Sequence, residues 1–337
     1  MSSQAKVFVQ YVVVIAITVL LIWFSLRGLQ VGEGGNKWDY LVKTWYAADK
    51  GWLFMMAFIA IVSHYVRAIR WRMLLVPVGQ HTSLNYSFLS LMVGYLVNLV
   101  IPRGGEVSRC YNLYKLDKVP VEISFGTVVL ERIVDLLCLI ILVALSFLVE
   151  SQKLIDFINT LPINIGEGGS KFRNLAYVIG ISIVVFGILY WFVKKNKKAN
   201  NFLVKTWNGF KGGVLSVFQL QNKGLFIFYS ILIWVLYFFM SYAVIKAFPA
   251  TSVLGFHAVL SLFAIGSIAM AAPLPGGTGS YHVLVPQGLV FLYHIDQTDA
   301  VAFTFIFHGW QTIILIVAGV ISLLITSFIV KKKPRVD

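Results

Sequence analysis

Charged residues stand inside apolar sequence at two places close together in the chain. Arg103, Glu106 and Arg109 follow directly on one apolar run, and a second group of three begins at Glu131 inside the next run. A charged side chain in the hydrocarbon of a bilayer costs about 2.5–3.5 kcal/mol on insertion scales, so such residues are rare there unless they pair or line a polar cavity. The stretch 98–135 is therefore where the sequence predicts function.

The first group has the composition of a phosphate-binding site. Arg103 and Arg109 lie on either side of Gly104 and Gly105. Guanidinium groups match the geometry of phosphate oxygens, and glycines let backbone N–H groups approach an anion. The alternative is that both arginines only extend toward the cytoplasmic surface, as basic residues at membrane borders do. Glu106 beside them favours a specific polar network.

The second group lies deep in its apolar run. Glu131, Arg132 and Asp135 stand nine to thirteen residues into it, which at 1.5 Å per residue is about 14–20 Å, near the middle of a bilayer. Glu131 and Asp135 share a helix face, and Arg132 can reach Asp135 three residues on. One interpretation is that the charges of the group pair only with one another. Because the group is net negative, the other is that it also pairs with a further cation, such as Arg103 or Arg109.

A third stretch, 273–282, has two prolines and three glycines within its first seven residues. Proline and glycine oppose a regular helix, so the stretch exposes backbone polar groups, either to a cavity inside the protein or in a tight external turn.

Elsewhere the sequence has no metal-ligand spacing, phosphate-binding loop or Ser/His/Asp set, so we expect no metal or cofactor and favour a protein that is not an enzyme. Four histidines are expected as hydrogen-bonded interior residues, namely His64, His257, His294 and His308.

The composition predicts the elements that position these groups. Of 337 residues, 58% are hydrophobic and 12% are charged, against roughly 25% charged in soluble domains. Apolar runs of about 20 residues cross a bilayer as helices. The fold class is therefore an all-α polytopic membrane protein, forming a single integral membrane domain over 1–337. The runs are 7–26, 51–69, 83–101, 122–148, 175–193, 224–247, 252–272, 281–295 and 300–330.

The net charge of +14 follows a membrane pattern, so no nucleic-acid partner is expected. Residues 194–223 hold seven lysines and no acid, which makes them a cytoplasmic connection by the positive-inside rule, with an amphipathic helix in the interface over 199–220. Both termini are expected on the cytoplasmic side of the cell inner (cytoplasmic) membrane. Residues 27–50 and 150–173, with balanced charges, are expected outside.

The same rule predicts two re-entrant hairpins. If 83–101 crossed fully, the basic connections after it would face the wrong side, so we expect it to turn back near Pro102. Two crossings or one hairpin are equally compatible over 252–295, and the short, proline-containing 281–295 favours the hairpin. The expected architecture is about six full spans plus two broken or re-entrant hairpins.

The two halves of the chain, 7–148 and 175–330, have the same order of elements. Each has two spans, a broken segment and a last span, and the halves start from opposite sides. Gly94 precedes Gly104 by ten residues, as Gly266 precedes Gly276. Inverted repeats with broken helices at the midplane are typical of transporters, so the sequence indicates a possible inverted repeat.

Three motifs resemble the lysylphosphatidylglycerol synthase transmembrane family, also called flippase-like. They are NLVIPRGGEVSR at 98–109, ERIVD at 131–135 and PGGTG at 275–279. The resemblance covers nearly the whole chain and implies a polytopic membrane domain that, in bifunctional members, moves an aminoacylated phospholipid between leaflets. A separate C-terminal domain of those members makes the lipid, and this chain is expected to lack it.

Many members have an acidic residue where this chain has His282, so the lysyl-lipid substrate is not carried over. The expected substrate-binding residues are Asn98, Arg103, Gly104, Gly105, Glu106, Arg109, Glu131, Arg132, Asp135, Pro275, Gly276, Gly277, Gly279 and His282.

The function favoured by these observations is a translocator of phospholipid or of a lipid-linked headgroup. Its expected partners are membrane lipids with anionic phospholipid headgroups, and a lipid-synthesising protein is a candidate partner. Two alternatives remain open. One is a membrane-embedded lipid-modifying transferase with Glu131 or Asp135 as its base. The other is a membrane subunit that does not transport.

Overall fold

The computed structural model describes residues 36–160 and 197–332 apart from Pro273, together with Leu20, Trp23 and Leu26. Every regular element in these ranges is helical, which confirms the all-α polytopic membrane fold. The expected spans 7–26 and 175–193 lie outside the described residues, apart from those three side chains in the first, so the number of six spans stays a prediction.

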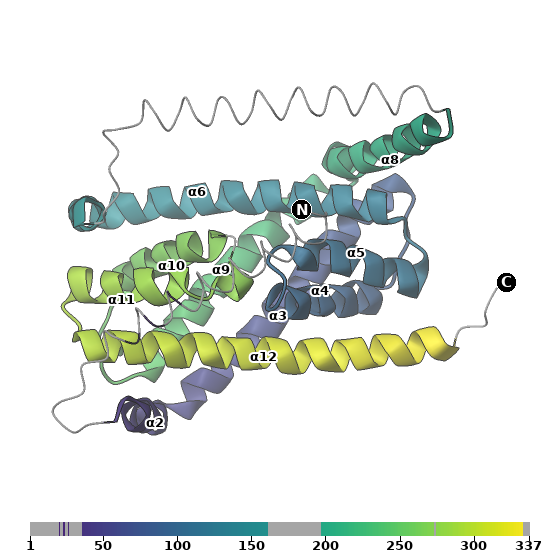
Figure 1. Ribbon diagram of the computed structural model, residues 1–337. Helices are drawn as coiled ribbons and strands as arrows, with labels where there is room; N and C mark the ends of the chain where they lie inside the picture. The colour runs from purple at the N-terminus through teal and green to yellow at the C-terminus, as the bar shows by residue number, and fades with distance from the viewer. Residues whose placement is uncertain are drawn as a thin grey trace, which may run out of the picture.

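Four of the described helices are long and apolar enough to cross a membrane. In Figure 1, α6 and α12 run antiparallel along opposite edges of the molecule, with α3 and α9 between them. Helix α3 makes its most extensive contact with α9. The bounds are α3 Lys50–Leu75, α6 Val121–Thr160, α9 Lys223–Ala247 and α12 Gln297–Lys332.

The first re-entrant hairpin consists of α4 (Leu84–Asn98) and α5 (Gly104–Asp117). With 15 and 14 residues, each helix is about 21–23 Å long, too short for the ~30 Å of a bilayer core. The hairpin opens toward the end of the molecule where α6 begins (Figure 1). The two helices approach closely because Gly105 has no Cβ; a Cβ at that position would overlap the Gly94 carbonyl oxygen. The expected return near Pro102 is therefore confirmed.

The second hairpin enters from the opposite end, where α12 begins (Figure 1). It consists of α10 (Phe256–Ala271), the short 3-10 turn η3 (Pro275–Gly277) and α11 (Ser280–Tyr293). Segment 252–295 thus forms a helical hairpin, and its return to the same side of the membrane stays a prediction.

The tips of the two hairpins meet midway along the molecule (Figure 1). Arg103, which has a left-handed backbone with φ 60°, donates a hydrogen bond from Nη2 to the Ala271 carbonyl oxygen at 3.0 Å. A Cβ on Gly276 would lie 3.1 Å from Leu99 Cδ2. The breaks therefore contact each other near the middle of the helical bundle (Figure 1).

Two shorter helices cover the ends of the bundle. Helix α2 (Lys37–Ala47), which the sequence did not predict, begins at Asn36, whose side chain accepts the Trp38 N–H. Helix α8 (Lys197–Leu215), followed by the 3-10 turn η2 (Ser216–Gln219), gives the helix expected over 199–220. It packs on α6 where Gly126 and Gly213 bring the two backbones together. Its position in the membrane interface stays a prediction.

The second set of helices repeats the first at a nearly constant displacement. Helices α9, α10, α11 and α12 begin 173, 172, 176 and 176 residues after α3, α4, α5 and α6. Corresponding helices run in opposite directions in Figure 1. The end of the molecule that carries α8 also carries Arg72, Lys115, Lys118, Lys223 and the last turn of α12.

Candidate functional site: a buried charge cluster beside the hairpin tips

Five charged side chains from three helices form one buried group, called here the charge cluster. Helix α3 contributes Arg67 and Arg70, α5 contributes Arg109, and α6 contributes Glu131 and Asp135. Arg70 and Glu131 have side-chain exposures of 0% and 1%, and the most exposed member, Asp135, reaches only 14%. The cluster therefore lies in the interior, where charges interact more strongly than in water.

Each carboxylate of the charge cluster binds two arginines. Asp135 pairs with Arg67 and, at 2.8 Å, with Arg70 Nη2. Glu131 pairs with Arg109 and lies 3.3 Å from Arg70 Nη2. Arg70 thus connects the two carboxylates, which stand one helical turn apart on α6.

Hydrogen bonds and a ring contact to neighbouring side chains also hold the arginines of the cluster in position. Arg67 Nη1 donates to the Tyr237 hydroxyl at 2.8 Å, and Arg70 Nη1 lies 3.3 Å from Ser230 Oγ, so both bind α9. The Arg109 guanidinium carbon lies 4.5 Å from the centre of the Trp71 ring, a cation–π arrangement. The cluster therefore joins α3, α5, α6 and α9.

The charges of the cluster do not balance within the part of the chain that the structure describes. Three guanidinium groups face two carboxylates, so one positive charge is in excess. The Nε–H groups of Arg67, Arg70 and Arg109 are also buried without a hydrogen-bond partner among the described residues. A buried cation with unused donors favours an anion with several acceptor oxygens, such as a phosphate.

The sequence predicted part of this cluster and missed part of it. Arg109 was one of two expected partners of the acidic residues, and it does pair with Glu131. Arg67 and Arg70 were not among the residues expected to bind substrate. Their spacing of three residues, on the same face as His64, was the signal that could have placed them on a buried stripe of α3.

Arg132 does not bind Asp135, so that expectation is wrong. It donates to Glu106 Oε1 at 2.6 Å and remains 42% exposed. The side chain leaves α6 on the face toward α5, while the arginines of α3 occupy Asp135. The Arg132–Glu106 pair therefore lies outside the buried cluster.

The remaining residues of the first motif shape the hairpin tip. The side chain of Asn98, the last residue of α4, accepts the N–H of Gly105 in the first turn of α5 at 2.7 Å. This hydrogen bond connects the end of one helix to the start of the next. Arg103 is exposed and lies at the tip, outside the charge cluster. Of the two arginines expected to bind a phosphate, Arg109 alone belongs to the cluster.

The third motif forms the tip of the second hairpin. Gly276, Gly277 and Gly279 have φ of 57°, 71° and 102°, values that side-chain-bearing residues rarely adopt. His282 Nδ1 accepts the Gly279 N–H at 3.4 Å, and His308 Nε2 lies 3.1 Å from the Gly276 carbonyl oxygen. Pro275 begins the short turn between them.

The four histidines that were expected in the interior divide into two pairs. His64 and His308 are buried as expected, with His64 against the Tyr95 ring at 4.6 Å. His257 and His294 are exposed, so the expectation of an interior position is wrong for both. They lie at the open end of the second hairpin, where α10 begins and α11 ends.

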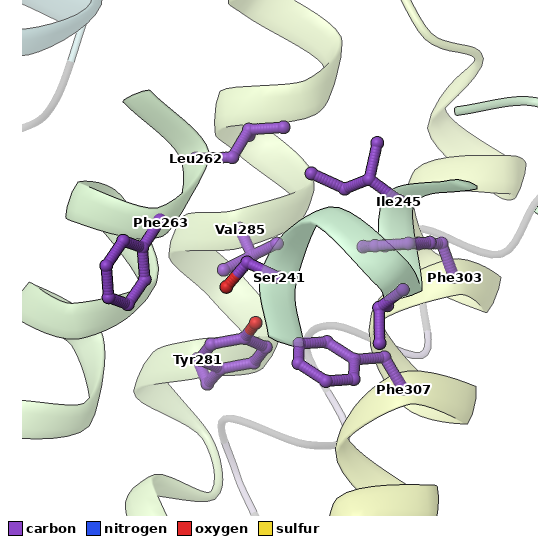
Figure 2. Close-up of a pocket in the computed structure, with 9 residues that line it drawn as sticks. Ser241, Ile245, Leu262, Phe263, Tyr281, Val285, Phe303 and Phe307 are labelled. Atoms are coloured by element: carbon purple, nitrogen blue, oxygen red, sulfur yellow. The ribbon is translucent and has the colours of Figure 1, made fainter. Parts of the chain in front are cut away.

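A small cavity lies between α9, α10, α11 and α12, with a volume of about 20 Å³, roughly one water. Figure 2 shows the hydroxyl oxygens of Ser241 and Tyr281 close together at this cavity, among the rings of Phe263 and Phe307. A second hollow of about 100 Å³ between α6 and the second hairpin is lined almost wholly by apolar side chains, including Phe147, Phe157 and Ile265. Neither has the volume and polarity of a headgroup site.

Comparison with known proteins gives one family and two distant relatives. The profile described as "Lysylphosphatidylglycerol synthase TM region" matches residues 11–319. The chain is 27% identical over 100 residues to UPF0104 membrane protein MJ1595 of Methanocaldococcus jannaschii, covering 29% of this chain and 30% of that protein. It is 26% identical over 308 residues to Glycosyltransferase AglD of Haloferax volcanii, covering 82% of this chain and 49% of that protein.

The matches thus cover less than half the length of each of these two relatives. No solved structure matches the chain significantly.

Proposed function

Because the chain belongs to the lysylphosphatidylglycerol synthase transmembrane family, we propose that it moves a phospholipid, or another lipid with an anionic headgroup, between the leaflets of the cytoplasmic membrane. The observation that carries this proposal is the charge cluster, with one excess buried positive charge beside the meeting tips of two re-entrant hairpins. A lipid phosphate entering there would balance the charge, while the acyl chains stay in the bilayer.

The arginines of the cluster are the phosphate ligands in this proposal. A phosphate would satisfy Nε–H groups of Arg67, Arg70 or Arg109, which are otherwise buried without partners among the described residues. Glu131 and Asp135 keep the arginines in place when the lipid is absent. The carboxylates also limit affinity, because the phosphate competes with them, and a translocator needs to release its lipid.

Access from both sides follows from the two hairpins. The first opens toward one end of the bundle and the second toward the other (Figure 1). In this proposal the halves 7–148 and 175–330 are an inverted repeat, and the tips part in turn on each side of the cluster. Close packing at corresponding positions supports the repeat, because a Cβ on Gly105 would meet Asn98 and a Cβ on Gly277 would meet Met270, seven residues earlier in both hairpins.

The orientation of the protein follows from its basic end. Cytoplasmic lysines and arginines outnumber those outside in membrane proteins, and the end that carries α8 has the lysine-rich connection 194–223. We assign that end to the cytoplasm, together with both termini. Five acidic residues lie toward the other end, namely Asp39, Asp49, Asp156, Asp296 and Asp299, whereas Asp117 and Glu122 lie at the basic end.

A lipid-modifying transferase is the second candidate, because the relative AglD is named a glycosyltransferase and matches along most of this chain. The match leaves half of that protein uncovered, so its name says little about the shared part. A general base also needs a carboxylate that can accept a proton from the substrate. Both Glu131 and Asp135 bind two arginines, which disfavours that role.

The proposal is tested with purified protein in liposomes that contain a fluorescent anionic phospholipid. Lipid in the outer leaflet is bleached chemically, and loss of the protected fraction measures movement between leaflets. We expect the protein to accelerate that loss, Arg109→Lys to keep most of the rate and Arg109→Gln to lose it. Lys115→Gln, at the surface end of the same helix α5, is the matched control.

Equal rates in protein-containing and empty liposomes would refute the translocator. A rate that Arg109→Gln leaves unchanged would refute the role of the charge cluster.

A further inference from the structure

Two histidines from neighbouring helices lie together at the second hairpin tip. The rings of His282 on α11 and His308 on α12 have centres 4.8 Å apart and stand nearly perpendicular, at 88°. Both residues are buried. Histidine is the side chain whose ordinary ionisation falls near physiological pH, so a buried pair at a backbone break is a candidate proton site.

Each of the two histidines holds a different backbone atom of the break. A carbonyl oxygen can only accept, so the proton of the His308 bond to Gly276 lies on Nε2. The Gly279 N–H can only donate, so His282 Nδ1 accepts with its lone pair and is not protonated. His282 stands at the capping-box position whose side chain reaches back to the N–H of the cap residue, and Gly279, which has no side chain, adds no second bond.

These two bonds respond differently to a proton. Protonated His308 still donates from Nε2 to Gly276. Protonated His282 carries hydrogen on both ring nitrogens and can no longer accept the Gly279 N–H. A proton on Nδ1 of His282 therefore opens the cap of α11, and no covalent bond changes.

The surroundings of the pair are apolar and favour neutral imidazoles, so the pair binds at most one proton at a time. The groups that face it are Tyr281 of α11, whose ring stacks on His308 at 5.5 Å, and the Phe305 ring of α12. On the side of the first hairpin, Arg103 reaches the Ala271 carbonyl at the end of α10. Two adjacent imidazolium ions would repel without a counter-charge.

We propose that His282 and His308 form a proton-binding site that changes the conformation of the second hairpin tip, and so couples lipid movement to protons. This inference rests on the proposed lipid translocation. Protonation of His282 frees the Gly279 N–H, and the turn of left-handed glycines rearranges. The tip then leaves the Leu99 and Arg103 contacts with the first hairpin. Loss of the proton restores the cap and closes the tip.

The test separates this inference from the translocation itself. Lipid movement is measured in liposomes with the wild-type protein, with His282→Gln and with His257→Gln, between about pH 8 and about pH 5, the range that spans histidine ionisation. Glutamine at this capping-box position can accept the Gly279 N–H but does not titrate. His257 is exposed at the open end of the same hairpin, which makes His257→Gln a matched control.

We expect the wild-type and His257→Gln rates to rise at least about tenfold on acidification, because the protonated fraction of one site rises up to tenfold per pH unit above its ionisation. The rate of His282→Gln should stay constant. If lipid moves but the wild type shows no pH dependence, or His282→Gln shows the same dependence as the wild type, the proton site is refuted and translocation stands. If no lipid moves at any pH, the translocator is refuted.

A second measurement on the unmodified protein needs no transport. Amide hydrogen exchange, corrected for its intrinsic pH dependence, reports local opening. We expect residues 276–283 to exchange about tenfold faster at about pH 5 than at about pH 8, while α4 exchanges equally. Unchanged exchange at 276–283 would overturn the proton site even if His282→Gln failed to fold.

Discussion

Glu131→Gln should destabilise the protein more than Arg70→Met, although both residues are completely buried members of the charge cluster. Without the Glu131 carboxylate, three arginines face Asp135 alone, and the excess rises from one positive charge to two. Without Arg70, two separate pairs remain, Arg67 with Asp135 and Arg109 with Glu131. The first change leaves a buried charge unpaired and the second does not.

The magnitudes follow from these contacts. Removing one partner of a buried ion pair costs about 3–5 kcal/mol, which is the loss we expect for Glu131→Gln. Arg70→Met loses the hydrogen bonds to Asp135 at 2.8 Å and to Glu131 and Ser230 at 3.3 Å each. Each hydrogen bond to a charged group contributes about 1.5–3 kcal/mol, and the balanced cluster offsets part of this. We therefore expect a loss of about 1–3 kcal/mol for Arg70→Met.

The assay is the unfolding midpoint of purified protein in mild detergent, followed by tryptophan fluorescence. Glu106→Gln is the control, because its partner Arg132 is 42% exposed and such a pair contributes about 0–1 kcal/mol. The expected order of destabilisation is Glu131→Gln, then Arg70→Met, then Glu106→Gln. If Arg70→Met lowered the midpoint as much as Glu131→Gln, the reasoning from excess positive charge would be wrong.

Three further predictions follow from the hairpins and the ends of the bundle. Asn98→Ala should lose about 0.5–1.5 kcal/mol with the Gly105 N–H bond, whereas Asn98→Asp, which keeps an acceptor, should retain more of the thermal stability. Gly277→Ala should destabilise by about 1–3 kcal/mol, because φ is 71° and a Cβ would overlap Met270; an unchanged unfolding midpoint would contradict the observed tip. A cysteine replacing exposed Trp207 on α8 should react with an impermeant thiol reagent only from the cytoplasm, and one replacing exposed Tyr46 on α2 only from outside; the reverse labelling would invert the orientation.

The re-entrant hairpins could be predicted from sequence because their signals are local. Pro102 with the glycines after it, and Pro275 with Gly276 and Gly277, interrupt helices wherever they occur. The distribution of lysines then requires the chain to return to the side it came from. The chain has no comparable signal for α2, which forms on the Asn36 cap and packs against α12, where Tyr40 donates to Asp299 at 2.6 Å.

The charge cluster was only half predictable because its partners depend on which helices pack together. The apolar run 51–69 contains Arg67 near its end and stops one residue before Arg70, so the sequence alone does not show that both arginines are buried. In the structure α3 continues to Leu75, and both arginines face α6 and α9. Arg132 shows the converse. Helical spacing brought it within reach of Asp135, but its actual partner on α5 follows only from tertiary contacts.

The separation of the buried ion pairs along the chain constrains the order of synthesis and membrane insertion. Arg70 leaves the ribosome 61 residues before Glu131 and 65 before Asp135. Until then Arg67 and Arg70 together add about 5–7 kcal/mol to the insertion of α3 when placed deep in the bilayer. We therefore expect nascent α3 to stay shallow, with its arginines at the headgroups, until α6 supplies their carboxylate partners. Quality-control proteases of the membrane would meet an incompletely inserted helix in any chain that stops before Glu131.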